Sequence, residues 1–384
     1  MGRFRDALAG SGLAAIAEIK RRSPSAGELR PGADAAVLGA SLAASGASAI
    51  SVLVDARFDG SFADLRAVRA ATALPLLAKG FFSSPADLEA AKESGADAVL
   101  LLLRDLDDAQ AAELQSFASS LGLDALVEAH DAEELGRAVA LDADPIGINS
   151  RDLSTFHVDR RRQLELVAQA PRDRVIVAES GVRSRAAAAE AELAGAHAIL
   201  VGTALMTASD PGAMLGSILA RPLVKICGLT RPEDVEAAGE AGADLAGFVL
   251  AEESPRRAEA VLPVPDTMLS VAVLVGELRE TGADLVQLYE REDGHRGRDA
   301  VLLRDGRTVA RVVDLPWQSG DPEHFTRARA TEGRVVLAGG LSPENVAAAV
   351  EAVRPWAVDV SSSLEVAPGI KDHERIRALL EAVR

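Results

Sequence analysis

Six apolar segments in the first half of the chain each end in residues that are able to do chemistry. The sequence between them is rich in Ala, Leu and Glu. The segments end at Glu18-Ile19-Lys20, Lys79, Glu128, Asn149, Glu179-Ser180-Gly181 and Gly202-Thr203. A buried parallel strand is expected to be apolar throughout, so repeated charge at strand ends has an energetic cost that folding alone does not explain. The pattern is typical of a (β/α)8 barrel enzyme, whose functional residues lie at the C-terminal ends of the strands.

Strand-like and helix-like segments alternate along the whole chain, which predicts parallel strands joined by right-handed crossovers. In the first half, eight strands are expected near residues 14–20, 49–55, 74–80, 97–103, 123–129, 145–150, 174–180 and 198–203. A second series follows Arg221-Pro222, near residues 223–228, 245–251, 268–276, 284–289, 309–314, 335–340 and 356–362, with a weak eighth candidate at 300–303. We therefore predict an α/β fold of two (β/α)8 TIM barrels in tandem, residues 1–221 and 222–384, of which the second is shortened or degenerate.

The composition excludes several classes of partner. A formal charge of −17 over 384 residues opposes binding to nucleic acid or to an anionic membrane, because that affinity comes mainly from Lys and Arg. The single Cys227 excludes an internal disulfide, and the chain has neither a signal-peptide segment nor an apolar run of about 18 residues. We expect a cytoplasmic and monomeric protein.

Metal and nucleotide cofactors are not indicated. The six histidines are scattered without the spacing of metal ligands, and no HExxH or CxxC motif occurs. A glycine-rich dinucleotide fingerprint is also missing after the predicted strands. We expect no metal and no cofactor.

Small residues follow the last two strands of each half, where barrels commonly bind phosphate with backbone N–H groups. They are Ser180-Gly181 and Gly202-Thr203 in the first half, and Gly339-Gly340 and Ser361-Ser362 in the second. One such pair would be an ordinary turn, but the same arrangement in both halves favours a phosphate site in each. We predict two phosphorylated ligands, one per domain.

Charged residues at the strand ends of the first half indicate proton transfer on an anionic substrate. Glu18 and Lys20 lie two residues apart on one strand, so their side chains point to the same face. Lys79 and Glu128 end the third and fifth strands. A buried Lys-Glu pair could instead neutralise itself in a polar layer of the barrel. Two Lys, three Glu and one Asn, all at strand ends, favour acid–base machinery around an anion.

Several motifs carry a resemblance to known families. The segments Ala17-Glu18-Ile-Lys20-Arg-Arg-Ser23-Pro-Ser25, Ile50-Ser-Val-Leu53, Ile148-Asn149-Ser-Arg151-Asp-Leu153 and Ala178-Glu179-Ser180-Gly181 resemble indole-3-glycerol phosphate synthase. The segments Val224-Lys-Ile-Cys227-Gly-Leu-Thr230, Ser254-Pro-Arg256, Leu337-Ala-Gly-Gly-Leu-Ser-Pro-Glu-Asn345 and Pro368-Gly-Ile-Lys371-Asp372 resemble phosphoribosylanthranilate isomerase. The whole chain resembles the fused, bifunctional enzyme of tryptophan biosynthesis.

The resemblance implies that the first barrel closes a carboxyphenylamino-deoxyribulose phosphate to indole glycerol phosphate, with loss of CO2 and water. It implies Lys79 as general acid on the sugar carbonyl, and Glu128 and Glu18 as the residues that move protons. Lys20 would attract the substrate carboxylate, in a substrate site that also contains Glu179. The remaining implied contacts are Ser23, Asn149 and Arg151 to the anthranilate group and Ser180, Gly181, Gly202 and Thr203 to the phosphate.

For the second barrel, the resemblance implies an Amadori rearrangement of a phosphoribosylanthranilate. Cys227 would remove a proton from C2 of the ribosyl group, Asp314 would protonate the ring oxygen, and Arg256 would bind the anthranilate carboxylate. The phosphate would lie at Gly339, Gly340, Ser361 and Ser362. The family places this Asp on the sixth strand before a glycine-rich loop, but here Leu315-Pro-Trp-Gln-Ser-Gly320 follows, so Asp314 could instead end the fifth strand. An impaired isomerase is expected.

Two departures from the synthase pattern predict a working but weakened enzyme. Gly80 replaces the Asp that follows the catalytic Lys, and the family's lid helix is missing before Gly2. Without the neighbouring carboxylate the Lys79 ammonium should lose its proton more easily, and without the lid the substrate should be held less firmly. The same departures suit a reduced pseudoenzyme that binds phosphorylated intermediates or partners without turnover. A lyase that uses Lys79 as a Schiff-base nucleophile is a third hypothesis.

Overall fold

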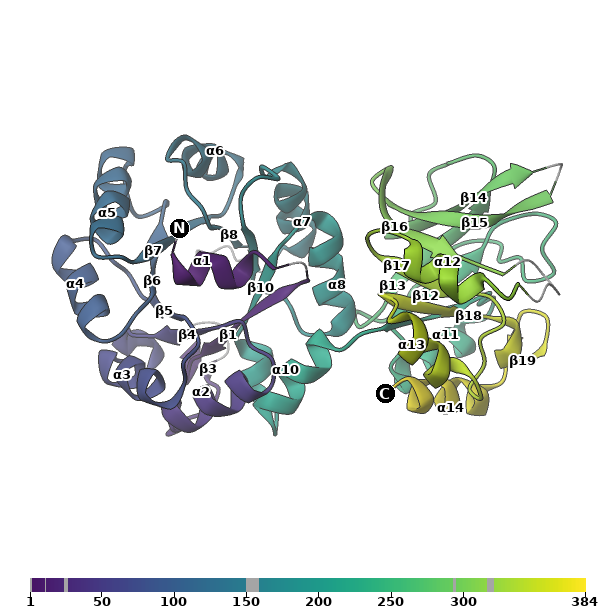
Figure 1. Cartoon of the computed structure of the whole chain (residues 1–384), viewed down its shortest axis with the longest axis horizontal. Coiled ribbons are helices and arrows are strands. Elements are labelled where there is room, and N and C mark those ends of the chain that lie inside the picture. Colours follow the sequence, from purple (N-terminus) through teal and green to yellow (C-terminus); the bar gives the residue numbers. More distant parts are fainter. Residues whose placement is uncertain (1, 11, 24–26, 150–158, 293–294, 316–320) are drawn as a thin grey trace. The chain divides into compact units, whose positions relative to one another are not determined.

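The chain forms two compact units, Met1–Leu219 and Ala220–Arg384 (Figure 1). This computed structural model describes residues 2–10, 12–23, 27–149, 159–292, 295–315 and 321–384. Each unit contains its own closed barrel of eight strands. Among the described residues, no helix combines the length and the apolar character needed to cross a membrane.

The eight strands predicted for the first half are confirmed, and all pair in parallel around a closed barrel. In chain order they are β1 (Ala14–Ile19), β4 (Ala49–Leu53), β5 (Leu76–Lys79), β6 (Ala98–Leu102), β7 (Asp124–Ala129), β8 (Ile146–Asn149), β9 (Ile176–Glu179) and β10 (Ala198–Val201). Parallel pairing brings the C-terminal ends of all eight strands to the same rim. Two short strands, β2 (Arg22–Ser23) and β3 (Gly27–Glu28), form a separate hairpin after β1.

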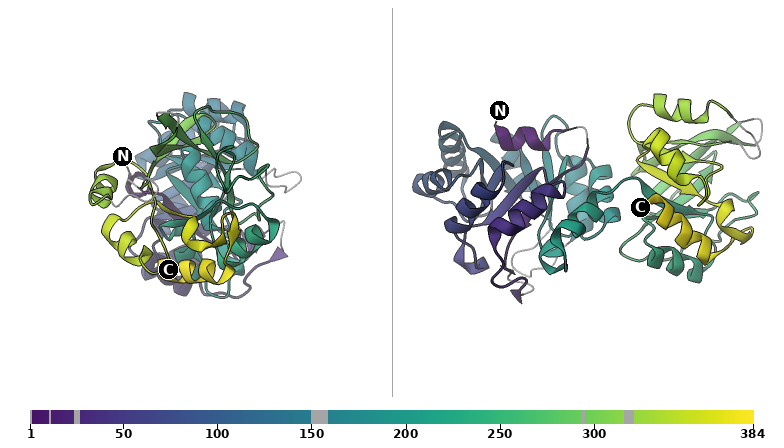
Figure 2. Two further views of the ribbon diagram at one scale, coloured as in Figure 1. Left: turned by 90° about the vertical axis from the view of Figure 1, so that its right-hand side faces the viewer. Right: turned by 60° about the horizontal axis from the view of Figure 1, so that its bottom comes forward.

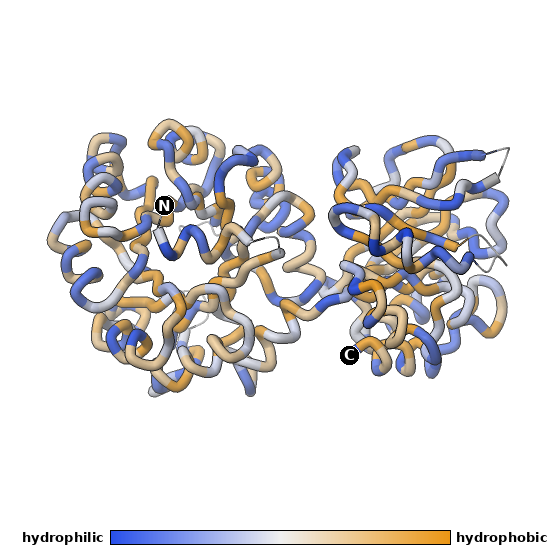
Figure 3. Tube along the Cα trace, in the orientation of Figure 1, coloured by the Kyte–Doolittle hydropathy of each residue, from blue (hydrophilic) through white to orange (hydrophobic). Residues whose placement is uncertain are grey.

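Helices surround this ring of strands (Figures 1 and 2). They are α2 (Ala35–Ala44), α3 (Phe62–Ala71), α4 (Pro85–Glu93), α5 (Asp108–Ser120), α6 (Ala132–Ala140), α7 (Arg160–Gln169), α8 (Arg185–Ala194), α9 (Thr203–Thr207) and α10 (Pro211–Leu219), with the 3-10 turn η1 (Ala56–Phe58). Helix α4 begins as its sequence predicts, because Asp87 accepts a hydrogen bond from the Ser84 N–H at 2.9 Å and Pro85 occupies the first turn. Hydrophobic and hydrophilic stretches alternate along the trace of the helices (Figure 3), as their half-buried position requires.

A short N-terminal helix, α1 (Arg3–Leu8), closes the end of the first barrel opposite the strand C-termini. Phe4 and Leu8 are fully buried in the cluster of residues that fills the barrel interior. The N–H groups of Phe4 and Arg5 each donate to the carboxylate of Asp124, at the start of β7, at 3.0 Å. The helix therefore acts as a plug of the barrel floor, and it does not cover the opposite rim.

The second barrel differs from the prediction of an all-parallel, shortened ring. Its strands are β11 (Leu223–Cys227), β12 (Leu245–Val249), β13 (Leu269–Val275), β14 (Leu285–Glu292), β15 (His295–Arg304), β16 (Arg307–Val313), β17 (Val335–Ala338) and β18 (Ala357–Val360). The weak candidate at 300–303 is thus part of a full eighth strand, which runs antiparallel to both neighbours. Asp305 and Gly306 link β15 to β16 with positive φ values of 49° and 73°, the conformation of a tight hairpin.

What the second barrel lacks is helices. A parallel neighbour needs a long crossover, whereas antiparallel strands need only a turn, so the β14–β15–β16 hairpins replace helical connections. Residues 250–268 and 276–284, all of which the structure describes, also form no α-helix. The helices present are α11 (Pro232–Ala241), α12 (His324–Ala330), α13 (Val346–Val353) and α14 (His373–Val383), with the turn η2 (Ser362–Leu364) and the hairpin of β19 (Glu365–Ala367) and β20 (Ile370–Lys371).

The plug predicts a large stability effect for one substitution. Phe4→Ala would leave a cavity at the barrel floor and is expected to lower the free energy of unfolding by about 3–5 kcal/mol. Urea unfolding followed by circular dichroism measures this change. The control Val37→Ala, at a side chain that is 66% exposed, should stay within about 0.5 kcal/mol of wild type. Equal unfolding curves for the two variants would contradict the role of α1.

Candidate active sites

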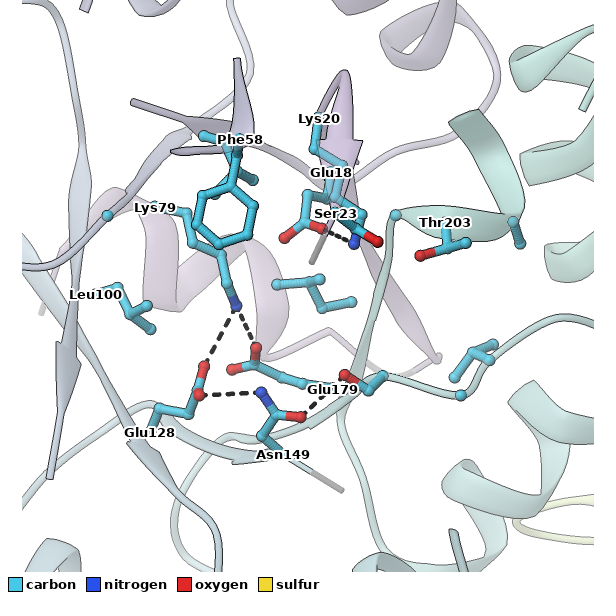
Figure 4. Close-up of a pocket in the computed structure, with 18 of the residues that line it drawn as sticks. Glu18, Lys20, Ser23, Phe58, Lys79, Leu100, Glu128, Asn149, Glu179 and Thr203 are labelled. Carbon is cyan, nitrogen blue, oxygen red and sulfur yellow. Dashed lines mark hydrogen bonds and ion pairs between the residues drawn. The ribbon is translucent and has the colours of Figure 1, made fainter. Parts of the chain in front are cut away.

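One cavity opens among the strand C-termini of the first barrel (Figure 4). It encloses about 1070 Å³, including its open mouth. Every described site residue predicted in the first half lines it, namely Glu18, Lys20, Ser23, Lys79, Glu128, Asn149, Glu179, Ser180, Gly181, Gly202 and Thr203. Arg151 lies outside the described residues. Residues from six barrel strands or their ends, and Ser23 of β2, therefore converge on one place.

The ammonium of Lys79 lies between two buried carboxylates. Its Nζ is 3.3 Å from Oε2 of Glu128, and it also contacts Oε2 of Glu179. Burial alone would lower the pKa of Lys79, but the charges of Glu179, Glu128 and Glu18 outweigh it, and the pKa rises well above its usual range. The expectation that the Lys79 ammonium loses its proton more easily beside Gly80 is therefore wrong, because these carboxylates supply the negative charge.

Glu128 receives several donors at once. Its Oε1 accepts from Nδ2 of Asn149 at 3.0 Å and lies 3.1 Å from Nε2 of His130, while its Oε2 faces Lys79. Burial would raise the pKa of Glu128, but the charge of Lys79 and the contact with His130 lower it well below its usual range. Burial and the neighbouring Glu128 charge have the opposite effect on Glu179, and raise its pKa to about 8. Glu128 therefore loses its proton more readily than Glu179.

A second ion pair lies on the β1 side of the cavity. Nζ of Lys20 is 2.7 Å from Oε1 of Glu18, so the two side chains share one face as their spacing predicts. A Cβ at Gly202 would lie 2.3 Å from Oε1 of Glu18 and 3.0 Å from Nζ of Lys20. Gly202 thus leaves the space that this pair occupies, in addition to being a candidate phosphate contact.

The candidate phosphate segments of the first barrel border the same cavity. Ser180 and Gly181 have positive φ values of 68° and 76°, and Oγ of Ser180 donates to Oδ1 of Asn149 at 2.9 Å. Gly202 and Thr203 form the start of α9. Arg183 also lines this side, and the sequence analysis did not single it out.

The opposite wall is apolar, and the sequence analysis missed it. Leu53, Leu100 and Leu102 line it, and the rings of Phe58 and Phe81 stack with centroids 6.3 Å apart. Gly80 also lines the cavity, and a Cβ there would lie 3.0 Å from the side chain of Val54. The cavity therefore combines an aromatic and aliphatic wall with a charged floor.

His130 beside the site was also missed by sequence reasoning. It follows β7 by one residue and bridges Glu128 and Glu134, with Nδ1 3.0 Å from the Glu134 carboxylate. Burial would lower its pKa, but the contacts with Glu128 and Glu134 outweigh it and raise the pKa to about 10. The signal in the sequence was its place two residues after Glu128, which a search for metal-ligand spacing overlooks.

A cavity of the second barrel collects the described candidates of the second half, which are Cys227, Arg256, Asp314, Gly339, Gly340, Ser361 and Ser362. Asp314 directly follows β16, the sixth strand of the ring, so the alternative that it ends the fifth strand is wrong. The antiparallel β15 occupies the fifth place.

A chain of buried polar groups crosses this second barrel. Nζ of Lys225 is 2.7 Å from Oδ2 of Asp359 and from Oε1 of Gln287, and 3.3 Å from Sγ of Cys227. Burial and the charge of Asp359 raise the pKa of the Cys227 thiol, although Lys225 opposes them. The thiol is therefore protonated in this state. Lys225 was not a sequence candidate, although it lies two residues before Cys227 and so faces the same side.

The carboxylate of Glu365 holds the side chain of Arg256 in place. Its Nε lies 2.9 Å from both carboxylate oxygens of Glu365, and Nζ of Lys371 contacts the same carboxylate at 2.9 Å. Gly339 and Gly340 have positive φ values of 82° and 67° beside the cavity, and Oγ of Ser361 donates to the carbonyl of Cys227 at 2.9 Å. The loops after β17 and β18 thus line the same cavity as Cys227.

The raised pKa of His130 gives a direct test. An ordinary His loses its proton near pH 6.5, whereas His130 should stay protonated to about pH 10. Its contribution to stability is present below about pH 6.5 and is lost as the pH rises through the folded-state value. NMR titration of the six His rings, assigned with His130→Asn, measures the midpoint. A midpoint near 6.5 would show that the bridge to Glu128 and Glu134 does not form.

Comparison with known proteins agrees with the two-barrel division. The family model for indole-3-glycerol phosphate synthase matches residues 2–218, and the model for N-(5'phosphoribosyl)anthranilate isomerase matches residues 320–382. The second match begins after β16 and therefore leaves out the antiparallel β15.

Relatives extend the likeness to the whole chain. The tryptophan biosynthesis protein TrpCF of Yersinia pestis is 34% identical over 99% of this chain and 87% of its own length. An indole-3-glycerol phosphate synthase of Leifsonia xyli is 49% identical over 52% of this chain and 77% of its own. A solved phosphoribosyl anthranilate isomerase from Thermus thermophilus is 29% identical over 42% of this chain and 98% of its own, with a TM-score of 0.35. The chain belongs to the family of fused proteins in which an indole-3-glycerol phosphate synthase barrel precedes a phosphoribosylanthranilate isomerase barrel.

Proposed function

We propose that the first barrel closes the indole ring in tryptophan biosynthesis, converting 1-(2-carboxyphenylamino)-1-deoxyribulose 5-phosphate to indole-3-glycerol phosphate. The observation that carries the proposal is the Lys79 ammonium held between Glu128 and Glu179, with the Glu18–Lys20 pair in the same cavity. A noncatalytic barrel has no need of this much buried charge. None of the relatives found points to a pseudoenzyme.

The ionisation states suit the steps of the reaction. Lys79, whose raised pKa keeps it protonated, is the general acid that polarises the sugar carbonyl while the aromatic carbon attacks it. Loss of CO2 restores the aromatic ring, and loss of water completes the indole. Glu128 and Glu18, whose pKa values are both lowered, take up protons in these later steps. Glu179 keeps Lys79 in place.

Charge and shape also suit the substrate. Lys20 is the cation for the departing carboxylate, and Ser23, Asn149 and Arg151 orient the anthranilate group. The phosphate binds at Ser180, Gly181, Gly202 and Thr203, opposite a wall that includes Phe58 and Leu100. This mechanism uses no metal or cofactor. The net charge of −17 opposes binding to nucleic acid or to an anionic membrane, and we propose a monomeric protein of the cytoplasm.

For the second barrel we propose the preceding isomerisation, that of N-(5-phosphoribosyl)anthranilate. Asp314 delivers a proton to the ring oxygen as the C1–O bond breaks and the amine lone pair forms a C1=N bond. Cys227 then removes the proton from C2, and the resulting enolamine becomes the aminoketone. Arg256 binds the anthranilate carboxylate, and the loops at Gly339, Gly340, Ser361 and Ser362 bind the phosphate. The raised pKa of Cys227 means that the thiol must first lose its proton, so a slow isomerase is expected.

Separate assays of the two half-reactions test both assignments. Lys79→Ala is expected to lower ring closure by a factor of about 10²–10⁴, the usual contribution of a general acid, and Cys227→Ala to lower isomerisation similarly. Each variant is the control for the other barrel. Ring closure at the wild-type rate in Lys79→Ala would end the synthase mechanism, and an isomerisation rate unaffected by Cys227→Ala would end the other.

A glycine on β8 gives a finer test of the Lys79–Glu179 contact. A Cβ at Gly147 would lie 2.3 Å from Oε1 of Glu179, the far end of a flexible side chain. Gly147→Ala should therefore fold while it displaces Glu179, and kcat of ring closure should fall by about 100-fold, as misplacement by about 1 Å commonly causes.

The matched control is Gly136→Ala on α6, where a new Cβ meets nothing within 4 Å and Ala is the better helix former. Its kcat should equal that of wild type. A Gly147→Ala enzyme with full activity would show that the position of Glu179 is unimportant.

A further inference from the structure

The reversed strand β15 brings a cation to the isomerase cavity that a parallel strand would not bring there. Because β15 runs antiparallel to β14 and β16, its first residues lie at the rim where the other strands end. Arg296 is the second residue of β15, it lines the cavity, and Arg291 at the end of β14 is its cross-strand partner. A role for Arg296 in this cavity rests on the isomerase function proposed for the second barrel.

Arg296 contacts the group to which the proton-donor role is assigned. Its Nη1 lies 2.7 Å from Oδ2 of Asp314, and the hydroxyl of Tyr289 donates to the same oxygen at 2.9 Å. The guanidinium also lies over the ring of Tyr289, 4.2 Å from its centroid. In this arrangement Oδ2 of Asp314 is engaged as an acceptor by the guanidinium and the phenol, and it is not placed to donate to a substrate.

The other charged and titratable groups around Asp314 do not contact its carboxylate in any hydrogen bond found among the described residues. From β15, Asp299 accepts the backbone N–H of Asp314 at 3.0 Å, and from α12, Arg327 donates to the backbone carbonyl of Asp314 at 3.2 Å. His324 on α12, Cys227 on β11 and Asp359 on β18 face the same region. Arg296 is thus the cation whose movement would change the charge at the Asp314 carboxylate.

Arg296 is also free to turn in a way that Arg256 is not. Its side chain is 37% exposed and rests on an aromatic ring, whereas Arg256 is 17% exposed and fixed by Glu365. An entering substrate anion offers this guanidinium the same kind of partner as the Asp314 carboxylate, and stacking on Tyr289 persists while the guanidinium rotates.

We propose that Arg296 is a positioning residue that changes its partner when the substrate binds. In the empty cavity it neutralises Asp314, and on binding it turns to the anionic substrate. Asp314 then takes a proton from solvent and delivers it to the ring oxygen of the substrate. Substrate binding is coupled in this way to the uptake of a proton by Asp314. An empty site therefore does not present a protonated acid to water.

Isomerisation kinetics across pH test the proposal with full-length Arg296→Met, Arg296→Lys and the control Arg311→Met. Arg311 is an exposed residue of the adjacent β16. Loss of one charge-assisted contact should raise KM for Arg296→Met about tenfold or more. Arg296→Met also removes the cation that contacts Asp314, so the pH above which kcat/KM falls should move upward. Arg296→Lys should lie between this variant and wild type, and Arg311→Met should match wild type.

Calorimetry gives a readout that does not need turnover. Binding of the reduced product, the alditol of the carboxyphenylamino sugar phosphate, is measured in two buffers of different ionisation enthalpy. Wild type should take up more protons than Arg296→Met, and the shared synthase site cancels in this difference. An unchanged KM and pH profile, or equal proton uptake, overturns the role of Arg296. If wild type fails to isomerise while the difference in proton uptake persists, the isomerase function fails and the exchange at Arg296 stands.

Discussion

Carboxylates buried among the apolar strands of a closed barrel are unfavourable without a cation. In the first barrel the Lys79 ammonium is that cation. Glu128 and Glu179 are each almost fully buried, and two carboxylates so close together cannot both ionise without a cation. Lys79 lies between them and keeps one ionised, while Gly147 leaves the space for Glu179. Removal of Lys79 would leave Glu128 buried without its cation, so the two strand ends and the ion pair depend on one another.

The first barrel could be predicted closely from the sequence because its signals are local. A buried parallel strand is an apolar run, and a charged residue at its end stands out, so both the strands and Glu18, Lys79 and Glu128 were found together. Closure of the ring then brings residues distant in sequence to one rim. The apolar wall could not be found this way, because Phe58 and Phe81 look like ordinary core residues until the cavity is seen.

The second barrel was predicted less well because strand direction is not a local property. Apolar runs at 284–289, 300–303 and 309–314 are compatible with parallel or antiparallel pairing, and the strict alternation of the first half favoured the parallel choice. The decisive signal was the dipeptide Asp305-Gly306 between two strand-like runs, which is a strong indicator of a hairpin. Length was a second signal, since the interval from residue 304 to 307 leaves no room for a helical crossover.

Depth along the strand separates the roles of Lys79 and Lys225. Lys79 is the last residue of β5, its side chain is 14% exposed, and it borders the cavity. Lys225 lies two residues before the end of β11, is 1% exposed, and is not among the residues that line the second cavity. A shift of two residues keeps the side chain on the same face but moves it about 6–7 Å down the barrel. The Lys79–Glu128 pair is therefore placed to contact a substrate of the first barrel. The Lys225–Asp359 pair instead supports Cys227 and the polar core of the second barrel.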